Sequence, residues 1–194
     1  MKKLFLQIII LLLGNTFSYA QAEELQDNDM LYVLESVSIS GRTNVNRFKF
    51  IYDSTKAEKV NVDKEVNYID SASDEVTFEL PVRAFDSKNP IMNRDFYEML
   101  KATSHPKIYV SIKKSVLESI AQGNPSDSID MKLTLVGVTK KIHGELQNAE
   151  EKALLKGLTK VNLKEYPLDF PSKMLGFVNI DEVVSINFDV VIKQ

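Results

Sequence analysis

The feature that most constrains the fold is an alternation of apolar and polar side chains, every second residue, that recurs along the chain. It is longest between residues 184 and 192, where five apolar side chains alternate with polar ones such as Asn187. It is most regular between Ile129 and Leu135. Successive side chains of a strand point to opposite faces, so this period indicates strands with one buried face.

The same pattern marks further stretches, separated by turn residues. The stretches are 37–39, 48–52, 60–62, 66–68, 76–80 and 108–112, and the turn signals include Gly41, Asp53-Ser54, Ser73-Asp74, Asn124-Pro125 and Gly137. Short strands at this spacing favour an antiparallel barrel or sandwich of about eight strands. The sequence therefore predicts an all-β domain.

One segment breaks the alternation and predicts a single short amphipathic helix. Between residues 89 and 100, Met92, Phe96, Met99 and Leu100 follow helical spacing. His105-Pro106 should end it, because the residue before proline disfavours the helical region. We expect this helix to cover one end of a barrel or to pack on its side.

The first twenty residues have the composition of a cleaved export signal. Lys2 and Lys3 precede a short apolar run, and small residues allow cleavage after Ala20 or Ala22. A retained anchor helix is the alternative. We therefore expect residues 1–20 to be a signal peptide, residues 21–30 a flexible lead-in and residues 31–194 the folded domain. The mature protein would be periplasmic or secreted from a bacterium, with no stable membrane anchor.

Composition excludes several classes of function. Removal of the two signal lysines changes the net charge from −3 to −5, which gives no electrostatic footprint for nucleic acid. The chain has no cysteine and two histidines, so thiol chemistry and most metal or haem sites are excluded. We expect no metal and no cofactor.

The sequence contains no recognisable catalytic constellation. His105 and His143 are each alone in their segments, and neither belongs to a metal-binding or nucleophile motif. The carboxylates, such as those at Asp181-Glu182 and Glu150-Glu151, have the setting of turn and surface residues. We expect no catalytic residues and no enzyme activity. A hydrolase built on a barrel would instead need two or more polar side chains converging inside it.

Four segments resemble a known family in the order in which that family has them. Residues 40–48 (SGRTNVNRF) resemble the opening motif of YceI-like proteins, and residues 93–100 with 105–108 resemble their helix and the following strand. Residues 133–140 (LTLVGVTK) are similar to the strand that ends in Gly-Val-Thr-Lys. Gly176 with residues 180–186 resembles the closing strand. Together they cover the chain from about Leu31 to Ile192.

The resemblance implies an exported, lipocalin-like antiparallel barrel whose interior carries a polyisoprenoid chain or a similar apolar lipid. Two departures affect the mouth of such a cavity. Asn46-Arg47-Phe48 replaces a pattern that often contains His-x-Trp, and Pro167 stands where glycine is usual. Proline fixes φ and removes a donor, so we expect a stiffer or differently shaped loop there.

The predicted ligand-binding residues are the inward members of the strands and the helical stripe. They are Phe48, Phe50, Val76, Phe78, Leu80, Phe96, Met99, Ile108, Val110, Ile112, Met131, Leu133, Leu135, Ile186 and Phe188. Arg42, Asn44, Asn46 and Arg47 are the candidates for a rim that contacts a lipid head group.

An eight-stranded barrel is wide enough either to fill with side chains or to hold one slender ligand. A carrier that transports, stores or sequesters a lipid needs the hollow form. A solid core would suit an interaction or stress-related module. The sequence leaves both open, together with the oligomeric state.

Overall fold

The computed structural model describes residues 30–44, 46–58, 74–124, 126–147, 154–170 and 180–193. The predicted signal peptide, the predicted strands at 60–62 and 66–68, Glu150-Glu151 and Gly176 lie outside these ranges. Within them, no helix is both long and apolar enough to span a bilayer.

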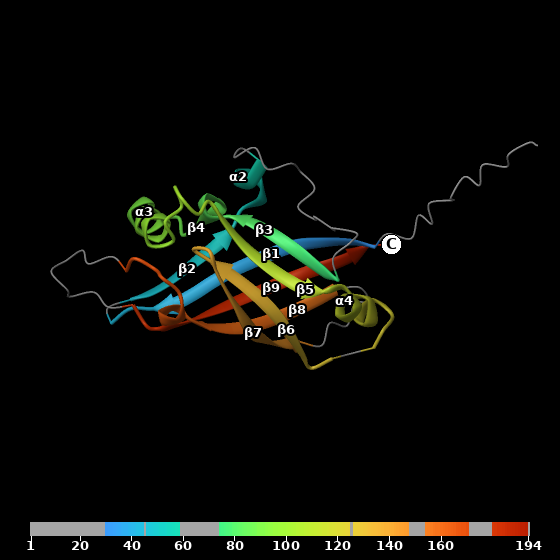
Figure 1. Cartoon of the computed structure of the whole chain (residues 1–194). Helices are drawn as coiled ribbons and strands as arrows, with labels where there is room; N and C mark the ends of the chain where they lie inside the picture. Colours follow the sequence, from blue (N-terminus) through green and yellow to red (C-terminus); the bar gives the residue numbers. More distant parts are fainter. Residues whose placement is uncertain are drawn as a thin grey trace, which may run out of the picture.

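The described chain forms nine antiparallel strands with short helices between them (Figure 1). The strands are β1 (Leu31–Arg42), β2 (Arg47–Tyr52), β3 (Glu75–Pro81), β4 (Phe85–Asp86), β5 (Lys107–Lys113), β6 (Ser128–Leu135), β7 (Val138–Gln147), β8 (Leu154–Asn162) and β9 (Val183–Lys193). The helices are α2 (Ser54–Glu58), α3 (Pro90–Met99) and α4 (Lys114–Ala121), with 3-10 turns η1 (Val82–Ala84) and η2 (Leu163–Glu165).

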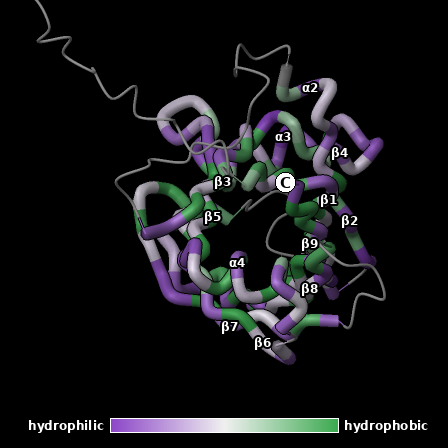
Figure 2. Tube along the Cα trace, turned by 90° about the vertical axis from the view of Figure 1, so that its right-hand side faces the viewer, coloured by the Kyte–Doolittle hydropathy of each residue, from purple (hydrophilic) through white to green (hydrophobic). Residues whose placement is uncertain are grey.

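The sheet order is β3-β5-β6-β7-β8-β9-β1-β2-β4, and the two ends of this series are joined by the chain itself. β3 runs through the three residues of η1 directly into β4. The segment therefore pairs with β5 along its first part and with β2 at Asp86 and Phe85. One bent strand thus brings the sheet edges together, and the strands form a ring in the end-on view of Figure 2.

A long ladder joins the first and last strands of the described chain. β1 and β9 pair from Leu31–Lys193 to Ser40–Ser185, with one register shift between Leu34 and Ser36. Apolar residues of both strands point inward, including Val37 and Phe188, as the alternation predicts.

The predicted fold class, an all-β antiparallel barrel, is confirmed. The described chain has nine strands where about eight were predicted, and it has short helices besides the predicted one. The predicted helix is α3, which Asn89 caps and which ends before His105-Pro106. β8 gave little alternation signal, because Gly157 and Thr159 interrupt its inward apolar set. α4 was not predicted, although its apolar residues Val116, Leu117, Ile120 and Ala121 have helical spacing.

The two ends of the barrel are built differently. At the end where α4 lies, six apolar side chains that are 3% exposed or less fill the interior. We call this set the floor: Tyr32, Val76, Leu117, Ile129, Leu155 and Ile192. At the other end, on the left of Figure 1, α3 lies beside the β1–β2 hairpin.

Candidate ligand cavity

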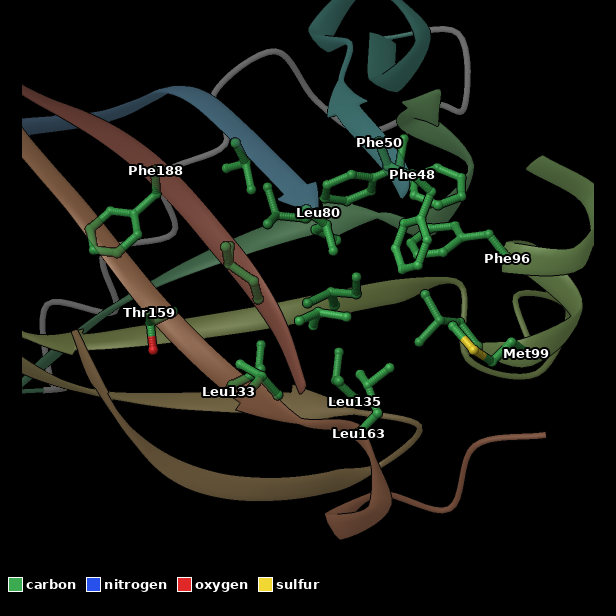
Figure 3. A pocket seen from close by; sticks show the side chains of 18 of the residues that line it. Phe48, Phe50, Leu80, Phe96, Met99, Leu133, Leu135, Thr159, Leu163 and Phe188 are labelled. Carbon is green, nitrogen blue, oxygen red and sulfur yellow. The ribbon is translucent and has the colours of Figure 1, made fainter. Parts of the chain in front are cut away.

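A cavity of about 520 Å³ occupies the barrel between the floor and α3 (Figure 3). Inward side chains from each of the nine described strands form its wall, together with residues of α3. The short strand β4 contributes Phe85. None of the six floor residues lines it. Small-molecule sites typically have volumes of about 300–1,000 Å³, so the space is large enough for a ligand. The barrel is therefore solid at one end and hollow at the other.

The structure places most of the predicted ligand-binding residues on this wall. Those that line the cavity are Phe48, Phe50, Phe78, Leu80, Phe96, Met99, Ile108, Val110, Ile112, Met131, Leu133, Leu135, Ile186 and Phe188. Val76 is completely buried but does not line the cavity, because it belongs to the floor.

Several wall residues were missed. Val184 and Val190 belong to the same alternating set as Ile186, and Val37 and Ile39 to the set of β1, so the period carried their signal. The other wall residues that the prediction omitted are Leu34, Phe85, Leu100, Ile142, Thr159, Val161, Leu163 and Ile180. Most of these lie in segments where glycine, a bend or a connection interrupts the period.

Two glycines opposite phenylalanines keep the lumen open. Gly41 pairs with Phe48 across β1 and β2, and Gly157 pairs with Phe188 across β8 and β9. A Cβ on Gly157 would lie 2.2 Å from Cζ of Phe188, and one on Gly41 would lie 2.4 Å from Cζ of Phe48. Each ring therefore lies over bare backbone, against the wall. Any other residue at either glycine would push the ring away.

The mouth of the cavity lies between the β1–β2 hairpin and the first turns of α3, and here the lining becomes polar. The hairpin contributes Thr43, Asn46 and Arg47, and the helix segment contributes Asn89, Ile91, Met92, Arg94 and Asp95. Of the predicted head-group rim, Asn46 and Arg47 reach the cavity, whereas Arg42 and Asn44 do not line it. The prediction missed Arg94 and Asp95 because they are polar and lie outside the apolar stripe of the helix.

Aromatic contacts hold α3 against the barrel. The ring of Phe96 stacks on Phe50 at a centroid distance of 4.2 Å and lies 5.9 Å from the ring of Phe85. Phe48 contacts Phe50 edge-on at 5.9 Å. Figure 3 shows the rings of Phe48, Phe50 and Phe96 gathered at one end of the cavity, with Phe188 at the other. The helix thus covers the hollow end with part of its apolar stripe.

A charged network fixes the start of α3. Asp86 accepts hydrogen bonds from Lys56 Nζ (2.5 Å), Asn93 Nδ2 (2.8 Å) and the backbone N–H of Lys88 (2.8 Å). The hydrogen bonds from Lys56 and Asn93 hold the pKa of the buried Asp86 carboxyl well below its usual range. Asn89 Oδ1 accepts from the N–H groups of Ile91 and Met92 as the helix cap. The network ties α2, β4 and α3 together beside the mouth.

Beyond the mouth, the described wall is apolar except for Thr159. Its hydroxyl donates to the carbonyl oxygen of His143 at 2.7 Å and so has a partner in the wall itself. His143 points outward and pairs with Asp130 at 2.9 Å. In the described part of the chain, no group of three or more histidine, aspartate or glutamate residues could hold a metal ion. The described wall therefore presents an apolar surface that a hydrocarbon chain can contact. No set of polar side chains converges on the space inside this wall.

β7 and β8 part toward the hollow end. Their pairing runs from Gln147–Lys156 to Gly144–Thr159 and goes no further. A groove of about 250 Å³ lies where they separate, lined by residues that include Lys141, His143, Lys160 and Tyr166. Burial raises the pKa of Tyr166 to about 12, and its hydroxyl lies 3.5 Å from the carbonyl oxygen of Leu133. Tyr166 therefore fills the barrel wall where the ladder is missing.

Comparison with known proteins agrees with this architecture. The sequence profile of the YceI-like domain matches residues 31–192. A polyisoprenoid-binding domain from Saccharophagus degradans, implicated in plant cell wall breakdown, superposes with a TM-score of 0.59 at 10% identity, covering 85% of this chain and 99% of that domain. BcnA from Burkholderia cenocepacia superposes with a TM-score of 0.52 at 15% identity, covering 80% of this chain and 94% of BcnA. No curated protein sequence matches the chain.

Proposed function

Because this chain belongs to the YceI-like family, and because its barrel encloses an apolar cavity, we propose that it is a binding protein for an apolar chain lipid of the isoprenoid class. The observation that carries this proposal is the 520 Å³ space, whose wall beyond the mouth is apolar except for Thr159. The polyisoprenoid-binding domain of Saccharophagus degradans, which shares the fold, gives it further support.

The energetics favour a chain lipid. Burial is worth about 0.8 kcal/mol per methylene-sized group, so an enclosed isoprene unit contributes roughly 3–4 kcal/mol. Three or four units would exceed about 10 kcal/mol gross, against an association cost of roughly 4–15 kcal/mol. Burial in the cavity can therefore give useful affinity without a polar contact inside the barrel.

The mouth is where a head group would be read. Arg47, Asn46 and Arg94 line it, and each presents donors to a phosphate, a hydroxyl or a carbonyl oxygen. In this arrangement the tail supplies the affinity and the rim distinguishes one head group from another. The protein needs no cofactor and no catalytic group for this task.

We also propose that the protein acts outside the cytoplasm, as a periplasmic or secreted carrier that transports, stores or sequesters its lipid. The support is the composition of residues 1–20, in which Lys2 and Lys3 precede a short apolar run and small residues allow cleavage. A cavity volume near zero would have favoured the solid-barrel alternative, and the cavity of about 520 Å³ does not support it.

The test is native mass spectrometry of protein purified from its own host, followed by solvent extraction and analysis of the released lipid. The expected result is one bound hydrocarbon chain per barrel. The protein emptied of ligand should also take up a fluorescent prenyl probe. Failure of both experiments would refute the proposed function.

A further inference from the structure

Exposed apolar side chains gather at the hollow end of the barrel. The described chain has five large apolar residues that are exposed: Leu31, Ile51, Ile91, Phe170 and Val183. Leu31 lies at the floor end and Ile51 on the side of the barrel, whereas the other three lie at the end that carries the mouth. Apolar surface gathered in one place marks an interaction site, which singly scattered residues do not.

Phe170 is held at the C-terminal end of α3. The backbone N–H of Asp169 donates to the carbonyl oxygen of Met99 at 3.2 Å, and the Asp169 carboxylate pairs with Lys101 at 3.3 Å. Phe170 follows directly, is 42% exposed and does not line the cavity. Ile91, which is 64% exposed, lies in the first turn of the same helix. The two exposed apolar side chains therefore lie at the two ends of α3.

The apolar surface of the cavity continues through the mouth to the outside. Ile91 lines the cavity and is exposed, and Phe48 and Met92 line it and are partly exposed. A lipid of the class proposed above is held in bilayers, because contact of its hydrocarbon with water is unfavourable. A path of apolar side chains from the barrel interior to a bilayer would keep the chain out of water during transfer.

Cations lie beside this apolar rim. Lys56 and Lys88 share the single carboxylate of Asp86, at 2.5 Å and 3.4 Å, which leaves an excess of positive charge at the start of α3. The Lys88 side chain is 80% exposed, and Arg47 is exposed on the β1–β2 hairpin. The charge of Arg94 is offset by two neighbouring carboxylates of α3 and adds nothing to this excess. Exposed apolar residues with lysine and arginine beside them are typical of surfaces that bind a bilayer.

We infer that the hollow end of the barrel docks on the surface of a lipid bilayer, and that the ligand passes between bilayer and cavity while the protein is docked. Ile91 and Phe170 enter the interfacial layer, and Lys88 and Arg47 lie at the level of the lipid phosphates. This inference rests on the proposed function and deepens it, because it assigns the partner with which the lipid is exchanged. Figure 1 shows α3 and the β1–β2 hairpin together at this end.

The experiment follows a fluorescent prenyl probe from the loaded, full mature protein to vesicles of phosphatidylcholine and phosphatidylglycerol. Transfer in the docked state requires a collision, so its rate should rise with the concentration of vesicles. Transfer through water is limited by dissociation of the probe from the protein, so its rate would not depend on that concentration.

Matched variants test the position of the docking surface. Phe170→Ser removes an apolar side chain that is 42% exposed at the hollow end, and Leu31→Ser removes one that is 43% exposed at the floor end. Neither residue lines the cavity, so both variants should bind the probe in solution as the unaltered protein does. Phe170→Ser should slow transfer at least about fivefold, because less apolar area enters the bilayer, and Leu31→Ser should leave the rate unchanged.

A fluorescent label locates the docked surface independently of the transfer rate. The sequence contains no cysteine, so Phe170→Cys and Leu31→Cys each provide a single labelling site. An environment-sensitive fluorophore at position 170 should shift its emission to the blue when vesicles are added. The same fluorophore at position 31 should keep its emission.

The outcomes are distinct. A transfer rate that rises with vesicle concentration and falls only in Phe170→Ser supports docking, as does a blue shift confined to position 170. A rate independent of vesicle concentration, or equal effects at both positions, overturns docking and leaves the proposed function standing. A dimer that Phe170→Ser dissociates, together with no binding to vesicles, would assign the surface to a second copy of this chain and overturn docking. Absence of probe binding in solution would overturn the proposed function and this inference together.

Discussion

Gly157→Ala should narrow the cavity, because it removes the space in which the ring of Phe188 lies. The new Cβ would lie 2.2 Å from Cζ and 2.7 Å from each Cε of that ring. To restore an ordinary contact of 3.4 Å at Cζ, the ring must retreat by at least 1.2 Å. The wall is behind it, so it can move only into the lumen.

The expected magnitudes follow from packing. Overpacking of this kind costs about 1–3 kcal/mol of stability, measurable as a shift in the urea midpoint. Loss of room for one methylene-sized group costs about 0.8 kcal/mol of binding, which is about a fourfold weaker dissociation constant for a chain that fills the cavity. A chain of two isoprene units, which leaves space unused, should be much less affected.

The control is the double variant Gly157→Ala/Phe188→Leu, in which the clashing ring is absent. It should recover most of the binding that Gly157→Ala loses. Gly144→Ala offers a milder comparison, since its Cβ would meet Cε of Met131 at 3.0 Å and Cγ2 of Ile129 at 3.2 Å, and shifts of a few tenths of an ångström relieve both contacts. If Gly157→Ala binds as the unaltered protein does, and a structure shows Phe188 unmoved, then the glycine does not keep the lumen open.

Three further predictions concern other parts of the barrel. Asp86→Asn should cost about 2 kcal/mol at pH 7, because the charge-assisted hydrogen bond that Lys56 donates to the carboxylate is lost. Because the pKa of Asp86 is lowered in the folded protein, the stability that this carboxylate contributes is present above about pH 4 and is lost as the pH falls toward the folded pKa. The urea midpoints of the variant and the unaltered protein should therefore converge in acid. A difference that stays constant with pH would contradict this. Leu133→Asp buries a charge in the apolar wall and should abolish prenyl uptake and destabilise the fold, whereas Lys113→Ala should do little; near-normal uptake by the Asp variant would show that the inward face is wrongly assigned. Tyr166→Ala should lower the melting temperature by several degrees and speed ligand release where β7 and β8 part, while Tyr166→Phe should keep the release rate; equal rates in both would contradict a wall-filling role.

The alternation of apolar and polar residues predicted the barrel and most of the residues that line its cavity, because the buried face of a strand is determined by consecutive residues. It also assigned the inward sets of β5, β6 and β9 by residue. It did not separate Val76 from Phe78, although both alternate inward in β3. One belongs to the floor and the other to the cavity wall, and that difference depends on how far along the barrel axis each residue lies.

Features that depend on contacts between distant residues could not be predicted from sequence. The space around Phe188 depends on a glycine 31 positions earlier, which becomes its neighbour only through the pairing of β8 with β9. The network at Asp86 joins Lys56 to Asn93 through the folded chain. Arg94 lines the mouth because the packing of α3 on the barrel places this polar residue beside the β1–β2 hairpin, and its position in the sequence does not indicate that packing.

The pairing of β1 with β9 has a consequence for how the protein is made. Tyr32 faces Ile192, 160 positions away, so β1 has no partner on that side until β9 has been synthesised. Loop closure over such a separation is slow, and a nascent chain that lacks residues 183–193 also leaves β8 without its second neighbour. The ring therefore cannot close before β9 has left the ribosome, and until then β1 and β8 each lack one neighbouring strand.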